Sequence, residues 1–362
     1  MRVLIVDDSV VTRLLLRTVL ESEGCQVREA SSGAQALKML LGYTPDIVTM
    51  DVHMPGMDGY ETTERILAQH ALPVVILTAS ANPYASETAM HALEVGALAV
   101  LEKPTSPDSP DFNQRIDELL RTLRSLAQVK IVRRPRKNGG ARGKPQALPQ
   151  LVGEARKSPP QLVAIAASAG GPVALKALLQ GLKVPCPWPL VLVQHIAAGF
   201  LQSFRDWLAS VSGLPVAIAE DGQTLAPGVL YLAPDGFHLG FSASRRVVLH
   251  DGAPENHIRP SANHLFRSVA QQFGQQAIGI QLSGMGHDGA EGMLGLRHAG
   301  ALTIAQEPSS AMIDSMPLAA IGLQAAQQVL APEGIASLLN ALAVQQAAVQ
   351  QVASQDARGR RE

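Results

Sequence analysis

Short runs of β-branched and aliphatic residues alternate along the chain with longer segments in which apolar residues recur every three or four positions. In the segment 10–23, for example, Leu14, Leu15, Val19 and Leu20 have the spacing of one helix face. Strands that alternate with helices predict a parallel, doubly wound α/β sheet. In the first 125 residues the predicted strands are 3–6, 26–29, 46–50, 74–77 and 98–101.

The same alternation returns after residue 160 and predicts a second doubly wound α/β domain. Within it, the interval from about 228 to 250 has strand patterns without helical ones, which indicates β-hairpins. The predicted strands are 162–167, 190–193, 216–219, 229–232, 277–282, 302–305 and 329–330, and the predicted helices include 173–182, 200–211 and 262–273.

Charge divides the chain at the same places. Residues 1–125 carry 10 basic and 17 acidic groups, whereas residues 126–160 carry 9 and 1. The second stretch is also rich in Pro and Gly, so we expect a flexible linker, either a solvated spacer or a basic strap that docks on an acidic surface. Residues 161–343 would form the second domain. The low-complexity segment 344–362 predicts a disordered tail or a frayed helix.

Composition narrows the function classes. The net charge of −1 argues against a dedicated nucleic-acid binder. The two cysteines, Cys25 and Cys186, lie in different predicted domains and form neither a disulfide framework nor a zinc spacing, which is typical of a reducing compartment. Asp7 and Asp8 end the first short apolar run, so we expect no signal peptide, and the apolar runs are too short to span a membrane. We therefore expect a cytoplasmic protein that is not membrane-embedded and does not bind nucleic acid.

Four predicted strands of the first domain end in residues suited to phosphoryl chemistry. Asp7 and Asp8 follow the first strand, Asp51 the third, Thr78 the fourth and Lys103 the fifth. The carboxyl ends of parallel strands meet at one edge of the sheet, where three carboxylates favour a hard cation such as Mg²⁺. An aspartate can accept a phosphoryl group, and a hydroxyl and an ammonium can contact its oxygens. One strand-end aspartate is usually a helix cap, so the signal lies in the combination.

By these residues the segment 1–125 resembles the receiver domain of two-component response regulators. The resemblance implies a flavodoxin-like fold and phosphorylation of Asp51 by a histidine kinase. It also implies that Asp7, Asp8 and Asp51 bind Mg²⁺ and that Thr78 and Lys103 form the switch.

Two details of this resemblance concern the switch. The resemblance implies a cis peptide bond between Lys103 and Pro104. The family usually has an aromatic switch residue three positions before the lysine, where this chain has Val100. We therefore expect phosphorylation without coupling through an aromatic rotamer at this position.

The first predicted strand of the second domain runs into Ser168, which is followed by Ala169, two glycines and Pro172. A proline that opens a helix places this serine near a helix N-terminus, where the dipole and free N–H groups favour a developing oxyanion. The serine is therefore either a helix cap or a nucleophile. The turn is not a G-x-S-x-G elbow, because Ala166 occupies its first position.

Two other strands of this domain lead to partners for such a serine. One ends at Gln194 and continues into His195, and a later one continues into a glycine-rich turn that contains His287 and Asp288. A histidine beside a serine can act as its base, and a carboxylate can orient the imidazole. We predict the set Ser168, His195 and Asp288, with His287 as the rival orienting group.

These segments resemble the catalytic domain of the chemotaxis protein-glutamate methylesterases over about residues 161–343. The resemblance implies a Rossmann-like three-layer domain in which Ser168 is the nucleophile, His195 the general base and acid, and Asp288 the orienting acid. The motifs that carry it are the serine turn, Gln194-His195, Arg259-Pro260-Ser261, Met285-Gly286-His287-Asp288-Gly289, and Ala305-Gln306 near Met316-Pro317.

The serine turn departs from the family pattern, which is usually Gly-Ala-Ser-Thr-Gly-Gly. Here Ala166 and Ala169 replace the first glycine and the threonine. The nucleophile and both glycines remain, but one hydroxyl beside the site is lost. We expect an oxyanion site made by the backbone N–H groups of Ala169 and Met285.

The order of receiver, linker and esterase domain resembles the full-length methylesterase of bacterial chemotaxis. It implies phosphorylation-regulated hydrolysis of glutamate γ-methyl esters on methyl-accepting chemoreceptors, with release of methanol, and deamidation of receptor glutamines. The chemotaxis histidine kinase would supply the phosphoryl group, Mg²⁺ would serve phosphorylation alone, and the esterase would need no cofactor.

Two other function classes stay open. One is a non-enzymatic phospho-switch whose second domain binds a partner, and the other is a hydrolase that acts on a different ester. A DNA-binding regulator is disfavoured, because the second domain has no helix-turn-helix pattern.

Overall fold

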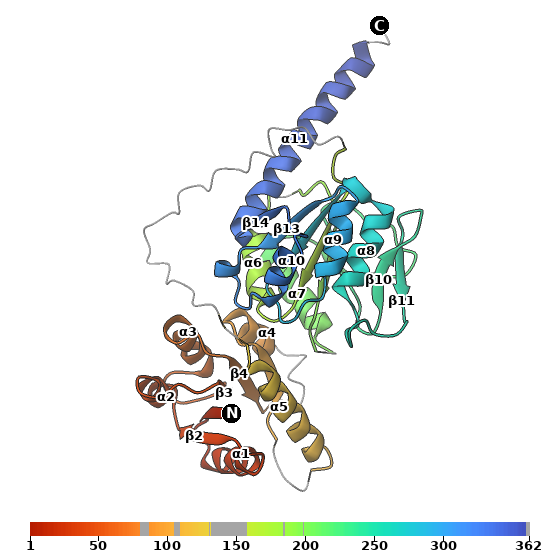
Figure 1. Ribbon diagram of the computed structural model, residues 1–362. Helices are drawn as coiled ribbons and strands as arrows, with labels where there is room; N and C mark the ends of the chain where they lie inside the picture. The colour runs from red at the N-terminus through yellow and green to blue at the C-terminus, as the bar shows by residue number, and fades with distance from the viewer. Residues whose placement is uncertain are drawn as a thin grey trace, which may run out of the picture. The chain divides into compact units, whose positions relative to one another are not determined.

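The computed structural model describes residues 1–79, 87–104, 109–129, 131, 158–183, 185–197 and 199–359 (Figure 1). Most of the predicted linker, namely residues 130 and 132–157, and the last three residues of the predicted tail lie outside this part of the chain. The chain divides into two compact units. Each unit is built on one parallel sheet with helices between its strands, so the predicted α/β class is confirmed for both.

The first unit contains a five-stranded parallel sheet in the order β2-β1-β3-β4-β5. This is the flavodoxin-like order, in which the order of strand addition reverses between β1 and β3. Its elements are β1 (Arg2–Val6), α1 (Val10–Ser22), β2 (Gln26–Ala30), α2 (Gly33–Leu40), β3 (Ile47–Asp51), α3 (Gly59–Gln69), β4 (Val74–Thr78), α4 (Glu87–Glu94), β5 (Ala99–Glu102) and α5 (Phe112–Leu126).

Burial and capping explain these elements. The central strands β3 and β4 are buried at every position, as expected for apolar strands covered on both faces. Helices α1, α2 and α3 each begin at a polar side chain, Ser9, Ser32 and Asp58, which accepts a backbone N–H of the first turn. The carboxyl ends of β1 and β3 carry the acidic residues, of which Asp7 and Asp51 are buried and Asp8 is exposed.

The second unit contains a seven-stranded parallel sheet in the order β14-β13-β12-β6-β7-β9-β8 and a separate antiparallel pair, β10-β11. Its strands are β6 (Leu162–Ala167), β7 (Leu190–Gln194), β8 (Val216–Ile218), β9 (Leu230–Leu232), β10 (His238–Phe241), β11 (Val247–His250), β12 (Ala277–Gln281), β13 (Leu302–Gln306) and β14 (Gln328–Leu330). Its helices are α6 (Gly171–Gln180), α7 (Leu201–Ser212), α8 (Ala262–Gln272), α9 (Ala290–His298), α10 (Ser315–Gly322) and α11 (Pro332–Gly359), with short 3₁₀ turns at Gly274–Gln276 and Pro308–Ser310.

Helices cover both faces of the seven-stranded sheet, with α6 and α11 on one face and α8, α9 and α10 on the other (Figure 1). The contact between α8 and α9 is very close: a Cβ atom at Gly292 would lie 2.7 Å from the backbone oxygen of Asn263. The Asn263 side chain also accepts the Gly292 N–H at 2.7 Å. Glycine in α9 thus fixes the position of α8, and with it the place where α8 begins.

The order in which strands are added to the sheet reverses at β6, which pairs in parallel with β7 on one side and with β12 on the other. Ligands of doubly wound sheets bind at the carboxyl ends of the strands beside such a reversal. The segments after β6, β7 and β12 therefore meet at one place, and these are the segments that carry Ser168, His195 and Asp288.

The hairpin prediction for 228–250 is right in part. Strands β10 and β11 form an antiparallel hairpin, with His238 opposite His250, but β9 pairs in parallel with β7 and β8 in the main sheet. Among the helices of the described residues, none combines the length and the apolar character that crossing a membrane requires.

Two predictions differ from the structure. The cis peptide bond within the described residues is Arg259–Pro260, whereas Lys103–Pro104 is trans, the isomer that the tertiary amide prefers when nothing selects the other. For 344–362 the disordered-tail alternative differs from the structure, whereas the helical alternative agrees with it, because α11 continues to Gly359. Alanine and glutamine dominate this segment, and both favour helix.

Candidate active site and phosphoacceptor site

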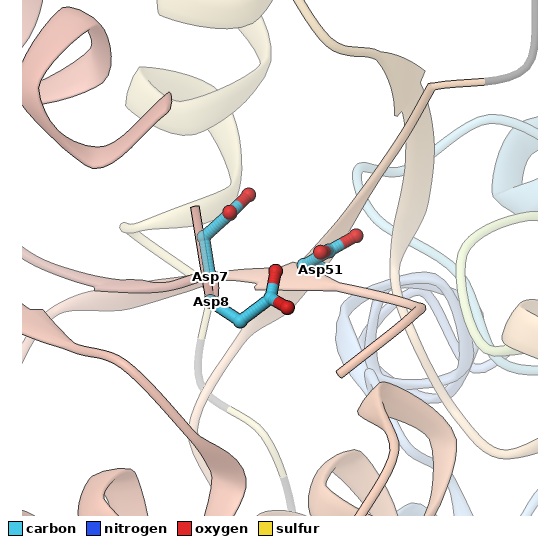
Figure 2. A group of neighbouring side chains, drawn as sticks. All are labelled: Asp7, Asp8 and Asp51. Atoms are coloured by element: carbon cyan, nitrogen blue, oxygen red, sulfur yellow. The ribbon is translucent and has the colours of Figure 1, made fainter. Parts of the chain in front are cut away.

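Three carboxylates gather at the carboxyl end of the first sheet (Figure 2). Asp7 and Asp8 follow β1, and Asp51 ends the neighbouring strand β3. One oxygen of each residue lies within 4.8 Å of the others, and Asp7 and Asp51 are buried while Asp8 is exposed. The structure therefore brings together the three residues predicted to bind Mg²⁺.

A lysine links two of these carboxylates. Lys103 Nζ lies 2.7 Å from Asp7 Oδ2 and 2.9 Å from Asp51 Oδ1. Thr78, at the end of the adjacent strand β4, is buried, and its backbone oxygen accepts the Lys103 N–H at 2.8 Å. The four strand ends predicted to form one site therefore do so.

Burial and pairing act in opposite directions on this site. Burial raises the pKa of the Asp7 carboxyl, and the contact with Lys103 opposes this only in part. Burial lowers the pKa of Lys103, but its hydrogen bonds with Asp7 and Asp51 outweigh that effect and raise it. The site thus holds more negative charge than one ammonium stabilises.

These carboxylates fit a divalent cation. Mg²⁺ prefers carboxylate oxygens and keeps open positions for water and phosphate oxygens. An exposed carboxylate on Asp8, beside the buried pair, leaves the cluster accessible from solvent. A cation there would offset the burial that raises the pKa of Asp7.

A close backbone approach fixes Asp51. A Cβ atom at Gly59, the first residue of α3, would lie 2.0 Å from the backbone oxygen of Asp51, and the Gly59 N–H donates to Val52 O at 3.0 Å. Only glycine fits there. The loop after β3 therefore returns directly over the acceptor residue.

Ser168 immediately follows β6 and lies in the turn before α6. Its N–H donates to Ser283 O at 3.0 Å, and its backbone oxygen accepts the Gly171 N–H at 2.8 Å. Gly170, in the left-handed region at φ 75°, caps α6, and the Ser168 side chain makes no cap bond there. The helix-cap interpretation of this serine is therefore not the one that the structure adopts.

His195 lies beside the serine turn, because β6 and β7 are neighbours in register. Gln194 pairs with Ala167, and the His195 N–H donates to Ala167 O at 2.9 Å. His195 Nε2 lies 3.0 Å from Asp288 Oδ2, the distance of an ion pair. The approach is not aligned along the ring N–H, so the contact is electrostatic rather than a well-formed hydrogen bond.

Asp288 is buried and receives three hydrogen bonds from the start of α8. Oδ1 accepts Ser261 Oγ at 2.9 Å and the Asn263 N–H at 3.0 Å, and Oδ2 accepts the Ala262 N–H at 2.7 Å. Burial raises the pKa of this carboxyl, but the contact with His195 and the backbone N–H groups outweigh it, so the pKa lies below its ordinary value. Asp288 therefore presents a fixed negative charge to the imidazole.

The rival orienting residue points elsewhere. His287 is exposed, whereas its neighbour Asp288 is buried against His195. Adjacent residues in an irregular turn face different ways, and only Asp288 reaches the imidazole. The structure thus distinguishes the two alternatives that the sequence left open.

Serine hydroxyls hold the two turns that carry the proposed oxyanion donors, Ala169 and Met285. The Ala169 backbone oxygen accepts Ser283 Oγ at 3.0 Å, which holds the serine turn against the segment after β12. The turn that carries Met285 is held by Ser315, whose hydroxyl donates to Gly284 O at 2.9 Å and accepts the Gly286 N–H at 3.1 Å. A hydroxyl from Ser283 therefore reaches the turn in which threonine is replaced by Ala169.

Sequence reasoning named Gln194 and Gln306 in motifs but gave no role to the residues that hold these loops in place. Three buried glutamines end β7, β12 and β13, and their side-chain amides bind the loop backbone. Gln194 donates to the oxygens of Ser168 and His195, each at 2.9 Å. Gln281 donates to the oxygens of Asp288 and Met316 at 3.1 and 2.9 Å, and Gln306 accepts the Ser283 N–H at 2.7 Å. A glutamine at the end of a buried apolar strand is the signal that could have revealed them.

Comparison with known proteins agrees with this geometry. Residues 163–339 match the family model described as CheB methylesterase, and residues 3–112 match the response regulator receiver domain. A protein-glutamate methylesterase/protein-glutamine glutaminase of Hahella chejuensis is 48% identical over 346 residues, covering 95% of this chain and 99% of its own. One from Syntrophus aciditrophicus is 41% identical, covering 94% and 98%.

A solved structure, the CheB methylesterase catalytic domain of Thermotoga maritima, is 33% identical and covers 51% of this chain and all of its own, with a TM-score of 0.49. The two matched families lie in the same order along this chain as its two units, and the relatives match over nearly their whole length. The chain therefore belongs to the protein-glutamate methylesterase/protein-glutamine glutaminase family, with an N-terminal receiver domain and a C-terminal methylesterase domain.

Proposed function

We propose that this chain hydrolyses glutamate γ-methyl esters on methyl-accepting chemoreceptors and that phosphorylation of Asp51 regulates this activity. The observation that supports the proposal is the contact of His195 Nε2 with Asp288 Oδ2 at 3.0 Å, beside the turn that carries Ser168 after the neighbouring strand β6. The relatives are named for ester and amide hydrolysis.

In this mechanism Ser168 Oγ attacks the ester carbonyl while its proton passes to His195. Asp288 faces Nε2, so Nδ1 is the ring nitrogen that receives the proton. His195 then returns the proton to the departing methoxide, which leaves as methanol. Water, deprotonated by His195, attacks the acyl-enzyme and releases glutamate and the free serine.

The oxyanion would be stabilised by the backbone N–H groups of Ala169 and Met285. Ser283 and Ser315 support this arrangement, because each hydroxyl bonds the backbone of one of the two turns. Donors that are fixed before the reaction cost no reorganisation when the charge develops.

The same site accounts for glutamine deamidation. Attack of Ser168 on a side-chain amide forms the same acyl-enzyme, and His195 protonates the departing amine, which leaves as ammonia. One site would therefore serve both the methylesterase and the glutaminase activity for which the relatives are named.

In the receiver, the Asp51 carboxylate would attack the phosphorus of the phosphodonor, a histidine kinase, and the bond to the donor nitrogen breaks. Lys103, already 2.9 Å from Asp51, is placed to contact the phosphoryl oxygens, and Thr78 lies at the next strand end. Asp7, Asp8 and Asp51 would hold Mg²⁺, which supplies positive charge to the phosphoryl oxygens when bound.

The test is methanol release from methylated chemoreceptor membranes, with and without a small-molecule phosphodonor and Mg²⁺. We expect release that disappears in Ser168→Ala, and a stimulation by phosphodonor that disappears in Asp51→Ala. Phosphorylation of Asp51 without release from any receptor would favour a partner-binding switch instead. Turnover of small esters combined with no action on receptors would indicate a different substrate.

A further inference from the structure

A cluster of polar side chains adjoins Asp288 at Oδ1, whereas His195 faces Oδ2, and the mechanism above makes no use of this cluster. We call it the Ser261 cluster, and it consists of Ser261, Glu255, His264, Arg267 and His238. Ser261 is fully buried and connects the cluster to Asp288. The hydroxyl of this serine therefore lies between the catalytic acid and a second set of charges.

The Ser261 hydroxyl has one proton and two acceptors within reach. Asp288 Oδ1 lies 2.9 Å from Ser261 Oγ, and Glu255 Oε2 lies 3.4 Å from it. The hydroxyl oxygen also accepts the His264 N–H at 3.3 Å, as the cap of α8. The distances place the proton on the bond to Asp288.

The other members of the cluster keep Glu255 from competing for this proton. Glu255 Oε1 lies 2.5 Å from Arg267 and 3.1 Å from His264 Nδ1. Burial raises the pKa of Glu255, but Arg267 and His264 outweigh this and lower it. Glu255 Oε1 is thus occupied by the Arg267 guanidinium and the His264 ring on α8, and the serine remains available to Asp288.

Ser261 binds the carboxylate oxygen that does not face the imidazole. Oδ1 takes Ser261 and the Asn263 N–H, whereas Oδ2 takes the Ala262 N–H and faces His195. A donor on Oδ1 fixes the rotation of the carboxylate and draws charge away from Oδ2. It thereby sets both the direction and the strength of the hold on a protonated His195.

We propose that Ser261 is a positioning residue for the esterase, whose hydroxyl orients the Asp288 carboxylate and moderates its hold on His195. The inference rests on the proposed function, because it assigns Asp288 and His195 to catalysis. Loss of the hydroxyl would leave Oδ1 with the Asn263 N–H as its remaining donor, so the carboxylate would be less firmly oriented and more basic toward the imidazole.

The test compares Ser261→Ala and Ser261→Thr with wild type in the full-length protein, by methanol release from methylated receptor membranes over a range of pH. One charge-assisted hydrogen bond corresponds to a loss in kcat of about tenfold to a hundredfold. For Ser261→Ala we expect that loss, with KM unchanged, and a shift of the acid limb of the kcat/KM profile to higher pH. Ser261→Thr should restore most of both.

The control variant is Ser32→Ala, which removes the same kind of cap, a serine that accepts a first-turn N–H at 3.3 Å, from α2 in the receiver. It should lower the midpoint of thermal unfolding without moving the pH profile. If Ser261→Ala does not fold, Ser261→Cys keeps the volume with a weaker donor and should show the same kinetic direction.

The elements packed around Asp288 and Ser261 carry other titratable or charged groups, which are the same in all variants. A shift of the pH profile between variants therefore reports the effect of the Ser261 hydroxyl. These groups are His195 after β7, His238 on β10, Glu255 before α8, His264 and Arg267 on α8, and His287 beside Asp288.

The outcomes separate the two proposals. Methanol release that depends on Ser168 but is unchanged in kcat and pH profile in Ser261→Ala overturns the role of Ser261 alone, as does a Ser261→Ala profile that Ser261→Thr does not rescue. Release that persists in Ser168→Ala overturns the proposed function, and the role of Ser261 with it.

Discussion

Replacing Asp288 by asparagine tests the site more stringently than any other single change, because this carboxylate serves both the imidazole and the start of α8. Each oxygen is an acceptor: Oδ1 for Ser261 and Asn263, Oδ2 for Ala262 and the contact with His195. An amide keeps one acceptor and turns the other position into a donor. At least one buried backbone N–H of α8 then faces an N–H group.

Two magnitudes follow for Asp288→Asn. An unsatisfied buried donor costs about 1–3 kcal/mol, which corresponds to a fall of roughly 2–12 °C in the unfolding midpoint of a domain of this size. Loss of the orienting charge from a triad reduces kcat by about 10⁴-fold, or about 5.4 kcal/mol of transition-state stabilisation. The variant should therefore be less stable as well as inactive.

The stability that Asp288 contributes should depend on pH. The folded-state pKa of Asp288 lies below its ordinary value, so the ionised carboxylate stabilises the fold above about pH 4, and that stability is lost as pH falls through the folded-state pKa. The difference in unfolding midpoint between wild type and Asp288→Asn should shrink as pH drops below about 4.

Two measurements check these values: methanol release from methylated receptors and thermal unfolding by circular dichroism between pH 3 and pH 8. A variant that unfolds at the wild-type temperature at neutral pH would refute the capping argument. A variant that retains more than about a tenth of wild-type kcat would refute the assignment of Asp288 to the imidazole.

Three further changes give expected outcomes. Gly284→Ala places a Cβ atom 2.8 Å from Ser168 Cβ, so kcat should fall by about 10²-fold, whereas Gly295→Ala, with open space around it, should leave kcat unchanged; equal activity of the two would contradict the packing argument. Ser315→Ala removes the hydroxyl that bridges two backbone groups of the oxyanion turn and should lower kcat about tenfold at constant KM; a change in KM alone would exclude that role. Burial and His238 lower the pKa of His264, and Glu255 opposes this only in part. The fold therefore loses stability as pH falls from about 6.5 through the folded-state pKa of His264. Between pH 7.5 and 5.5 the thermal unfolding midpoint of wild type should therefore fall more than that of His264→Gln. An equal fall in the two midpoints would contradict this.

Much of the architecture could be predicted because it depends on local pattern. Strands of the parallel sheets are continuous apolar runs, and their ends carry the functional side chains, so Asp51 and Ser168 could be placed at strand ends from spacing alone. The choice between His287 and Asp288 could not be made in this way. It depends on which of two adjacent residues is turned inward, and that is fixed by the start of α8, a segment about 26 residues earlier in the chain.

The supporting roles of the three glutamines and of Ser261 were missed for the same reason. Gln194, Gln281 and Gln306 contact backbone in loops up to 35 residues away along the chain, and Ser261 reaches Asp288 across 27 residues. Hydrogen bonds of this kind leave no periodic signal. The C-terminal segment misled in the opposite way, since low complexity suggested disorder where an alanine-rich and glutamine-rich composition continues α11.

The chemical character of the supports differs between the two units. The loops of the esterase site are tied to their strands by neutral glutamine amides, which neither gain nor lose protons at any pH in which the protein folds. The receiver carboxylates are held by Lys103, which is shared between Asp7 and Asp51, together with the backbone N–H groups of Ser9 and His53. Protonation or a bound cation would therefore act directly on the receiver carboxylates, whereas neither would change the glutamine amides that hold the esterase loops. Acidity can therefore reach the esterase site through Asp288 and His264, but not through the amides that hold its loops.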